Sequence, residues 1–354
     1  MIGVGANVVR LWGLTAEERL RRMAGAEAPN APLLVNLGYA FDPEWLRYVA
    51  DRDDHVVTRA GIPVIANISS EGERRAVSDA MASLQPLGAT RLETTAFEQV
   101  DGLANEALRK KERPFMDRLT AETVPALERA SYFGAYKGVT DVLTKYLWPE
   151  WALVLTRIAV RAGITPNQVT IVGAILCVAA TILFWHGWYW SGLALGLVFM
   201  VLDTVDGKLA RCTITSSRWG NVADHGIDLI HPPFWWLAWG VGLAAYGRPL
   251  EDSLLWALLG AILAGYVAQR LIEGAFISRF KIHIHVWRRF DSRFRLIAAR
   301  RNPNMIILFA SLIAGRPDWG LIGVAAWTLI SLAVHIVQIG QAFAGRRPVE
   351  SWLA

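Results

Sequence analysis

The fold is decided by residues 162–202, which read AGITPNQVTIVGAILCVAATILFWHGWYWSGLALGLVFMVL. No Asp, Glu, Lys or Arg occurs anywhere in these 41 residues. At about 1.5 Å per residue, one helix of this length would be roughly 60 Å long, about twice the hydrocarbon core of a bilayer. The segment therefore predicts two membrane-spanning helices, with a turn at residues 186–190.

Four more charge-poor windows follow, at residues 229–247, 253–269, 302–315 and 319–345. Together with the first two, they predict an all-α domain of six transmembrane helices over residues 166–345, the fifth helix being short. Residues 1–130 are different, because they hold 16 Lys and Arg and 19 Asp and Glu, a net charge of −3. That balance is ordinary for a soluble domain, so the sequence predicts a multi-domain chain. Over the whole chain, 53% hydrophobic residues and two cysteines exclude disorder, collagen and a disulfide scaffold.

The basic residues of the short loops predict the orientation in the membrane. If the first span begins inside, two loop residues lie outside, Arg248 and Arg316. Eleven then lie inside: Lys208, Arg211, Arg218, Arg279, Lys281, Arg288, Arg289, Arg293, Arg295, Arg300 and Arg301. This asymmetry predicts an integral membrane protein, of a bacterial inner membrane, with both termini cytoplasmic. No long apolar core occurs in the first 30 residues, so we expect no cleavable signal peptide, and neither Cys177 nor Cys212 suggests an extracellular disulfide.

The soluble segment alternates between helix-like and strand-like stretches. Thr15 and Glu18 fit a capping box for a helix over residues 19–23, and Asp42-Pro43 begins a second helix that reaches residue 48. Further helices are expected at residues 71–84 and 103–111, and strands at 33–37, 63–68 and 90–93. This alternation predicts a small α/β domain with a largely parallel sheet.

Residues 131–165 are expected to form juxtamembrane helices in the membrane interface. An apolar stripe lies at i, i+3, i+4, i+7 and i+8: Trp151, Val154, Leu155, Ile158 and Ala159. Trp148 and Trp151 would be aromatic anchors, while Arg157 and Arg161 lie away from the stripe. The alternative is a helix buried within the soluble domain.

The chemistry is predicted by two spaced groups of small and acidic residues. One group reads Asp203-Thr-Val-Asp206-Gly207-Lys-Leu-Ala210-Arg211, and eight residues later the other reads Gly220-Asn-Val-Ala-Asp224-His-Gly-Ile-Asp228. On a helix, each group presents its acids on one face, so four carboxylates meet at the inner membrane boundary. Burying them is costly unless cations neutralise them, and oxygen ligands favour hard cations such as Mg²⁺ or Mn²⁺, of which four carboxylates could share two. The alternative is pairing with basic residues for stability, with Arg211 as a nearby counterion.

These eight spaced residues match the D-x-x-D-G-x-x-A-R-x8-G-x-x-x-D-x-x-x-D pattern without a departure, and the chain resembles the CDP-alcohol phosphotransferase family over about residues 131–345. The resemblance implies that an acceptor hydroxyl attacks the β-phosphate of a CDP-alcohol, usually CDP-diacylglycerol, and that CMP leaves. It implies metal ligands at Asp203, Asp206, Asp224 and Asp228, with Asp228 also the general base. It further implies a CDP pocket formed by Asn167, Thr170, Asp203, Gly207, Ala210, Arg211 and Ser217. It also implies a cytoplasmic active site, a role in phospholipid biosynthesis, lipid and acceptor-alcohol partners and a homodimer, with no nucleic acid bound.

Two other features are interpreted less directly. The stretch Arg288-Arg289-Phe290-Asp291-Ser292-Arg293-Phe294-Arg295 resembles the segment by which some relatives hold a phosphorylated acceptor, so Arg293 and Arg295 are the candidate acceptor-binding residues. The alternative is that these charges serve only topology and lipid headgroups. His231 lies on the acidic face, but we expect it to be a core histidine.

Residues 1–130 resemble a degenerate nucleotidyltransferase. Gly3-Val-Gly5 is followed by Ala6-Asn7 instead of an early basic residue, and Asn36 stands where a metal-binding Asp is expected. The leading hypothesis is therefore a lipid-synthesising transferase with an inactive soluble domain. The alternatives are a bifunctional enzyme that makes CDP-inositol and a soluble di-inositol phosphodiester, and a cation transporter that uses the acidic cluster.

Overall fold

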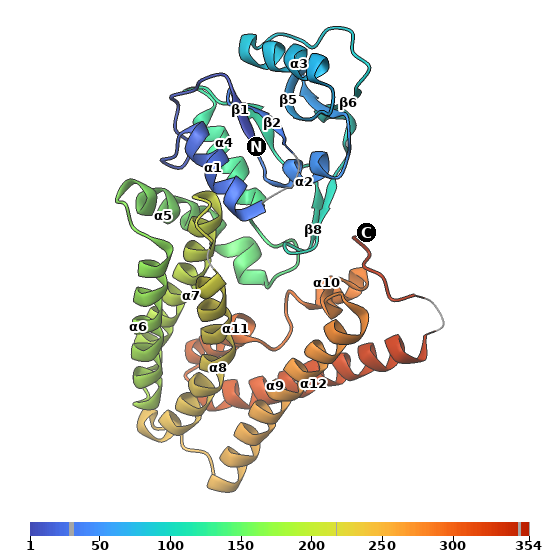
Figure 1. The fold of residues 1–354 in the computed structure, drawn as a ribbon. Helices are drawn as coiled ribbons and strands as arrows, with labels where there is room; N and C mark the ends of the chain where they lie inside the picture. The colour runs from blue at the N-terminus through green and yellow to red at the C-terminus, as the bar shows by residue number, and fades with distance from the viewer. Residues whose placement is uncertain (28–31, 217, 346–347, 354) are drawn as a thin grey trace. The chain divides into compact units, whose positions relative to one another are not determined.

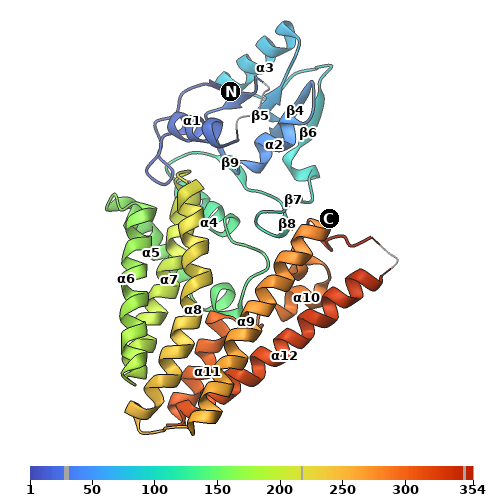
Figure 2. The same cartoon turned by 60° about the horizontal axis from the view of Figure 1, so that its bottom comes forward.

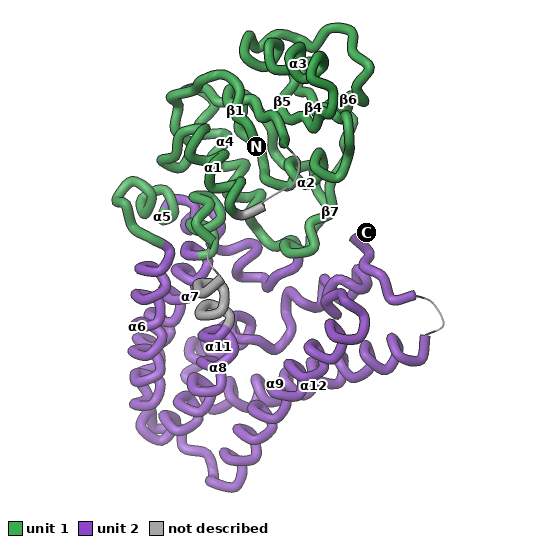
Figure 3. The backbone as a smooth tube through the Cα atoms, in the orientation of Figure 1, with its two compact units in different colours: residues 1–138, 155–165, 207–216 green, residues 139–154, 166–206, 217–354 purple. Residues whose placement is uncertain are grey.

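We describe the protein from a computed structural model that covers residues 1–27, 32–216, 218–345 and 348–353, with the side chains of residues 26, 27 and 218–225 left out. The chain divides into two compact units, which Figure 3 shows in different colours. Unit 1 comprises residues 1–138, 155–165 and 207–216, and unit 2 comprises residues 139–154, 166–206 and 217–354. The coarse expectation of a small α/β region followed by a helical region is confirmed.

The centre of unit 1 is a five-stranded sheet (Figure 1). Its order is β1 (Ile2–Val4), β2 (Leu34–Asn36), β5 (Ile62–Asn67), β4 (His55–Arg59) and β6 (Glu93–Ala96). The outer pairs β1–β2 and β4–β6 are parallel, whereas β5 is antiparallel to both of its neighbours. The prediction of a largely parallel sheet is therefore wrong. Its physical reason is a tight turn at Ala60 and Gly61, both with positive φ, which joins β4 to β5 as a hairpin.

Short helices and two small ribbons complete unit 1. The helices are α1 (Ala16–Glu27), α2 (Glu44–Ala50), α3 (Glu71–Ser83) and α4 (Val124–Gly134), with the short turn η1 (Phe97–Gln99). The expected capping box is confirmed, because the Thr15 backbone amide donates to Glu18 Oε2 at 2.8 Å and the Glu18 amide to Thr15 Oγ1 at 3.2 Å. The ribbons are β3 (Tyr39–Phe41) with β9 (Met116–Arg118), and β7 (Leu103–Asn105) with β8 (Lys110–Glu112).

The helix expected at residues 103–111 is wrong, because this segment is the β7–β8 hairpin. Asn105 Oδ1 accepts the Leu108 backbone N–H at 2.8 Å, and Arg109 has a φ of +52°, so the side chain stabilises a turn that stops a helix from forming. The strand expected at residues 90–93 begins at Glu93. The other strands and helices expected in the soluble segment lie where the sequence predicts them, with ends that differ by a few residues.

Unit 2 consists almost entirely of helices. They are α6 (Pro166–Trp185), α8 (Arg218–Tyr246), α9 (Asp252–Phe280), α10 (Arg289–Phe294), α11 (Arg301–Ile313) and α12 (Pro317–Ala344), with short turns η2 (Leu143–Leu147) and η3 (Ile284–Val286). Two helices, α5 (Pro149–Arg161) and α7 (Tyr189–Cys212), contribute residues to both units. Helices α9 and α12 pack against each other (Figure 2).

The turn predicted at residues 186–190 joins α6 to α7. Gly187 has a φ of +73°, which favours glycine, and the backbone of α8 passes close to this turn. A Cβ at Gly242 would lie 2.0 Å from the Phe184 carbonyl oxygen, so only glycine fits there. Behind the turn lies an aromatic core that includes Phe184, Tyr189, Trp235, Trp236 and Trp239.

Three of the described helices are long and apolar enough to cross a membrane: α6, α9 and α12. Helices α7 and α8 have 24 and 29 residues, and α11 has 13, so each charge-poor window of the sequence contains a helix. These lengths and compositions agree with an integral membrane protein.

Helix α5 exposes most of its apolar stripe. Trp151, Val154 and Ile158 are each more than half exposed, while Ala152 and Leu153 on another face are buried. The exposed stripe favours the interfacial helix over a helix buried in the soluble domain. Trp148 is not an exposed anchor, however, because it is 1% exposed and its indole N–H donates to Thr204 Oγ1 at 3.1 Å.

Candidate active site

Two of the four predicted acids meet at one arginine. Asp203 lies on α7 and Asp228 on α8, and Arg301, the first residue of α11, donates a hydrogen bond to each at 2.7 Å. The side chains of Arg301 and Asp203 are 12% and 17% exposed, so this bridge lies mostly out of water, whereas Asp228 is 45% exposed. The arrangement places two carboxylates from different helices on opposite ends of one cation.

Asp206 belongs to the same site. It is buried, and its Oδ2 accepts the Thr170 hydroxyl at 2.6 Å. Thr170 is the fifth residue of α6, so the start of this helix lies beside Asp206. A small pocket opens here, lined by Val169, Thr170, Gly173, Phe199, Asp203, Asp206 and Ile227.

Three other predicted residues are placed less fully. Asn167 lies on the first turn of α6 and is exposed. Asp224 lies on α8 four residues before Asp228, but its side chain is outside the described part of the structure, and Ser217 is outside the described residues altogether. Their roles therefore stay predictions.

Arg301 is the residue that sequence reasoning missed. The sequence places it among the basic residues of the inner loop, far along the chain from the acids, whereas Lys208, Arg211 and Arg218 are close to them. Arg301 is 98 residues from Asp203 and 73 from Asp228. One signal in the sequence points to this role. Arg301 directly precedes the charge-poor window at residues 302–315, and an arginine beside a membrane helix needs a counterion.

Gly207, Ala210 and Arg211 follow the acids on α7 and belong to unit 1. A Cβ at Gly207 would lie 3.1 Å from Arg211 Nη2, so the guanidinium lies directly over the glycine. The predicted open space beside Gly207 is thus bordered by a cation suited to phosphate oxygens.

A second polar cluster lies in unit 2 around Glu273 of α9. Both Glu273 oxygens accept from Arg300 at 2.6 Å, and Oε1 also accepts from Arg270 at 2.7 Å. His285 and His335 approach the same oxygen at 3.2 and 3.4 Å. The glutamate and two histidines have a spacing that could hold a metal ion, but the two guanidinium groups already exceed the charge of Glu273 and disfavour a further cation. The cluster instead fixes Arg300, the neighbour of Arg301 in the chain.

The two candidate acceptor residues differ in their surroundings. Arg293 on α10 is exposed, whereas Arg295 is partly buried near Asp141. Burial would raise the pKa of Asp141, but the Arg295 charge and hydrogen bonds from Thr144 bring that pKa below its ordinary value. The Asp141 carboxylate therefore neutralises part of the Arg295 charge.

His231 is a core histidine, as expected. It is 8% exposed, its Nδ1 lies 2.6 Å from the Ile227 carbonyl oxygen, and its ring packs edge-on against Phe199 and Trp235. These contacts hold it within the helix packing.

In the soluble segment, Asn36 serves the core. It is 1% exposed, its amide donates to the Pro63 and Met81 carbonyl oxygens, and its Oδ1 accepts the Gly38 backbone N–H at 2.9 Å. Every polar atom of this side chain is thus used within the fold.

Comparison with known proteins identifies relatives of the helical region. Residues 163–337 match the family model described as CDP-alcohol phosphatidyltransferase. A phosphatidylinositol phosphate synthase of Cutibacterium acnes is 29% identical over 218 residues, which are 57% of this chain and 96% of that protein. A protein of the same name from Mycobacterium tuberculosis is 31% identical over 141 residues, 36% of this chain and 65% of the relative. Cholinephosphotransferase 1 of Danio rerio is 28% identical over 127 residues, about a third of each chain.

The three long apolar helices and the family match of the helical region suggest an integral membrane enzyme. Residues 163–337 are a CDP-alcohol phosphatidyltransferase domain by this match, and the domain and its relatives support a transferase of substituted phosphate groups. Members of this family generally depend on a divalent metal ion.

Proposed function

We propose that this protein transfers a phosphatidyl group from CDP-diacylglycerol to the hydroxyl of an acceptor alcohol and releases CMP. The observation that carries the proposal is the meeting of Asp203 and Asp228 at Arg301, with Asp206 held by Thr170 beside them. Carboxylates gathered at the ends of membrane helices are stabilised by cations and are functional candidates. The names of the relatives describe a phosphatidyl product, which does not favour the bifunctional alternative with a soluble product.

The residues present fit a divalent metal ion. Asp203 and Asp228 already share one positive group, Arg301, and the donor set consists of oxygen atoms, which suit Mg²⁺ or Mn²⁺. Asp203, Asp206, Asp224 and Asp228 would hold two such ions. When bound, the ions supply positive charge that stabilises the transferring phosphoryl group and the departing CMP.

The remaining chemistry belongs to the side chains. Asp228 is the most exposed of the described acids, so it can reach an incoming acceptor and take its hydroxyl proton. The acceptor oxygen then forms a bond to the β-phosphorus while the bond from that phosphorus to the CMP oxygen breaks. Arg211, above Gly207, would pair with the nucleotide phosphates, and Asn167, Thr170, Ala210 and Ser217 would line the CDP pocket.

A phosphorylated inositol is the acceptor that we propose. The relatives are named phosphatidylinositol phosphate synthases, and such a product contains a phosphorylated inositol. Arg293 and Arg295 supply guanidinium groups suited to a phosphate. The same proposal includes a six-helix membrane domain in a bacterial inner membrane, a cytoplasmic active site and a homodimer. It also includes a degenerate nucleotidyltransferase-like domain, supported by the fully occupied polar atoms of Asn36.

The test is a direct assay of the purified full chain. Labelled CDP-diacylglycerol, Mg²⁺ and a panel of acceptors would be supplied: inositol phosphate, inositol, glycerol phosphate and serine. We expect CMP release and a labelled lipid product that appear only with metal and are fastest with inositol phosphate. If CMP were released only with an uncharged acceptor, the proposal of a phosphorylated acceptor would be wrong. If no acceptor gave CMP release, the proposed transferase activity would be wrong.

A further inference from the structure

The carboxyl end of α7 is part of unit 1, although the rest of this helix is not. The segment Gly207–Ser216 includes Gly207, Ala210 and Arg211, three residues that the proposed function places in the CDP pocket. The contacts that hold this segment within unit 1 should therefore affect how tightly the nucleotide binds.

The helix ends without a glycine. The Thr215 backbone N–H donates to the Ala210 carbonyl oxygen at 2.8 Å, which closes the last turn, and Ile214 occupies the left-handed region with a φ of +53°. Glycine is the usual residue at such a helix end, and a β-branched residue is strained there. Contacts from elsewhere must offset this strain.

Two arginines of α1 supply such contacts. Arg19 Nη1 donates to the Cys212 carbonyl oxygen at 3.4 Å, and Arg22 Nη1 donates to the Thr213 carbonyl oxygen at 2.7 Å. Carbonyl groups at a helix end lack partners within the helix and carry partial negative charge, so guanidinium groups stabilise them.

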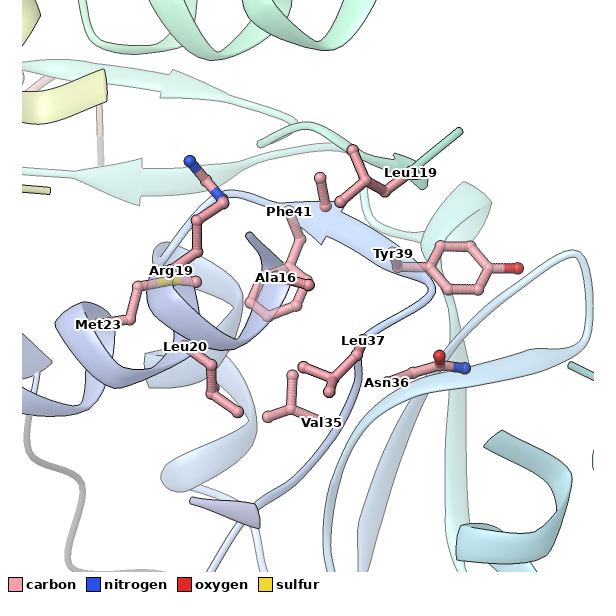
Figure 4. A pocket seen from close by; sticks show the side chains of 11 residues that line it. Ala16, Arg19, Leu20, Met23, Val35, Asn36, Leu37, Tyr39, Phe41 and Leu119 are labelled. Atoms are coloured by element: carbon pink, nitrogen blue, oxygen red, sulfur yellow. The ribbon is translucent and has the colours of Figure 1, made fainter. Parts of the chain in front are cut away.

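Arg19 is built into the core of unit 1. It is 5% exposed, and Figure 4 shows it with Ala16, Met23 and Phe41 along the wall of a small pocket between α1 and the neighbouring strands. Burial lowers the pKa of Arg19 to about 10, which leaves it charged at neutral pH. A buried arginine aimed at a helix end has a fixed position, unlike a surface side chain.

A third contact comes from α7 itself. Lys208 is 3% exposed, its Nζ donates to the Ala135 carbonyl oxygen at 2.8 Å, and it lies 3.3 Å from the centre of the Tyr136 ring. Lys208 occupies a variable position of the acidic motif, next to Gly207. The soluble segment thus holds the end of α7 on two sides.

From these contacts we infer that Arg19 and Arg22 are positioning residues for CDP-alcohol binding, and that through them the N-terminal domain fixes the nucleotide-binding end of α7. This inference rests on the proposed function. The acids Asp203, Asp206 and Asp228 lie outside the segment, so the arginines should affect nucleotide affinity more than proton transfer.

The kinetic test uses Arg19→Ala, Arg22→Ala and Arg19→Lys in the full chain. We expect Arg19→Ala to raise the KM for CDP-diacylglycerol about tenfold and Arg22→Ala about threefold, with kcat and the acceptor KM within about twofold of wild type. Arg19→Lys should recover most of the loss, because an ammonium group can still donate to a carbonyl. Arg21→Ala is the matched control, since Arg21 is an exposed residue of the same helix and should leave all constants unchanged.

A second readout does not depend on activity. Hydrogen–deuterium exchange of a peptide covering residues 207–216 should be faster in Arg19→Ala and Arg22→Ala, and unchanged in Arg21→Ala. Unchanged exchange and an unchanged KM in both variants would overturn the inference, as would an equal change in kcat and in both KM values. If wild-type protein released no CMP, the proposed function would fail, while the exchange result would still decide whether the arginines order this segment.

Discussion

Arg301 is the residue on which the described part of the acidic site depends. Its guanidinium joins carboxylates of α7 and α8 from a third helix, α11, and the cluster around Glu273 fixes Arg300 beside it. Removing one partner of a buried ion pair leaves the other charge unpaired, which costs about 3–5 kcal/mol in a fully buried site. Because the site is partly open to solvent, we expect loss of the Arg301 side chain to lower the free energy of unfolding by about 3 kcal/mol.

Arg301→Gln should make stability depend on metal. Without Mg²⁺ the variant should unfold at a lower temperature than wild type, and Mg²⁺ should raise its unfolding temperature more than that of wild type, because the ion and the guanidinium neutralise the same carboxylates. Thermal unfolding with and without Mg²⁺ measures this, with Arg248→Gln in an exposed loop as the control. An equal Mg²⁺ effect on all three proteins would show that Arg301 and the metal do not share ligands.

Asp228→Asn tests the general base. The amide cannot accept the acceptor proton, so kcat should fall about 10²- to 10⁴-fold. The other three acids remain, so binding of the CDP-alcohol should change much less. CMP release and CDP-alcohol binding would be measured in parallel, with Asp252→Asn at the exposed start of α9 as the control. Near-normal turnover in Asp228→Asn would rule out this base.

Arg293→Ala and Arg295→Ala test the acceptor site. Losing a bidentate phosphate contact should cost about 2–3 kcal/mol, or roughly 30- to 150-fold in the acceptor KM, with little change for CDP-diacylglycerol. Arg289→Ala, from the same helix and exposed, is the control. If all three variants keep the wild-type acceptor KM, the basic loop serves topology and lipid headgroups.

At the scale of elements, local signals predict more than long-range pairing does. The Thr15–Glu18 capping box involves residues three apart, and both of its hydrogen bonds form. The hairpin at residues 103–112 was missed because its Leu, Ala, Arg and Lys residues have good helix propensity, whereas its turn depends on one Asn105 side chain. The antiparallel β4–β5 pair was missed because Ala60-Gly61 is an unusual turn sequence.

The same contrast holds for the candidate site. The spacing of Asp203, Asp206 and Asp228 on two helices is visible in the sequence, and so is Thr170 near the start of α6. Arg301, the common partner of Asp203 and Asp228, is brought to the site only by helix packing, and so is the group of Glu273, His285 and His335. No local pattern records which residues three helices bring together.

Spin labels can test whether α5 lies in the membrane interface. With Cys177 and Cys212 replaced by Ala, labels at Trp151→Cys and Ile158→Cys should be more accessible to oxygen than to a water-soluble nickel complex. A label at Arg161→Cys, away from the stripe, should show the reverse. Power-saturation measurements in vesicles give both accessibilities. Equal preference for the nickel complex at all three positions would mean that the stripe faces water.

At the scale of the whole molecule, the proposed degenerate domain predicts a missing activity. The full chain should release no pyrophosphate from CTP with inositol phosphate or sugar phosphates, because Asn36 is committed to core hydrogen bonds where a metal-binding Asp would be needed. A coupled pyrophosphate assay measures this, and CMP release from CDP-diacylglycerol by the same sample is the positive control. Metal-dependent pyrophosphate release would restore the bifunctional alternative.

The division into units also constrains how the protein is made. The chain passes from one unit to the other after residues 138, 154, 165, 206 and 216. A ribosome must therefore synthesise residue 216, and with it helices α6 and α7, before the amino-terminal unit has all of its parts. The helices α6 and α7 are thus synthesised before the fold of the amino-terminal unit can be completed, and an amino-terminal fragment that ends before α6 would lack residues 207–216 of that unit.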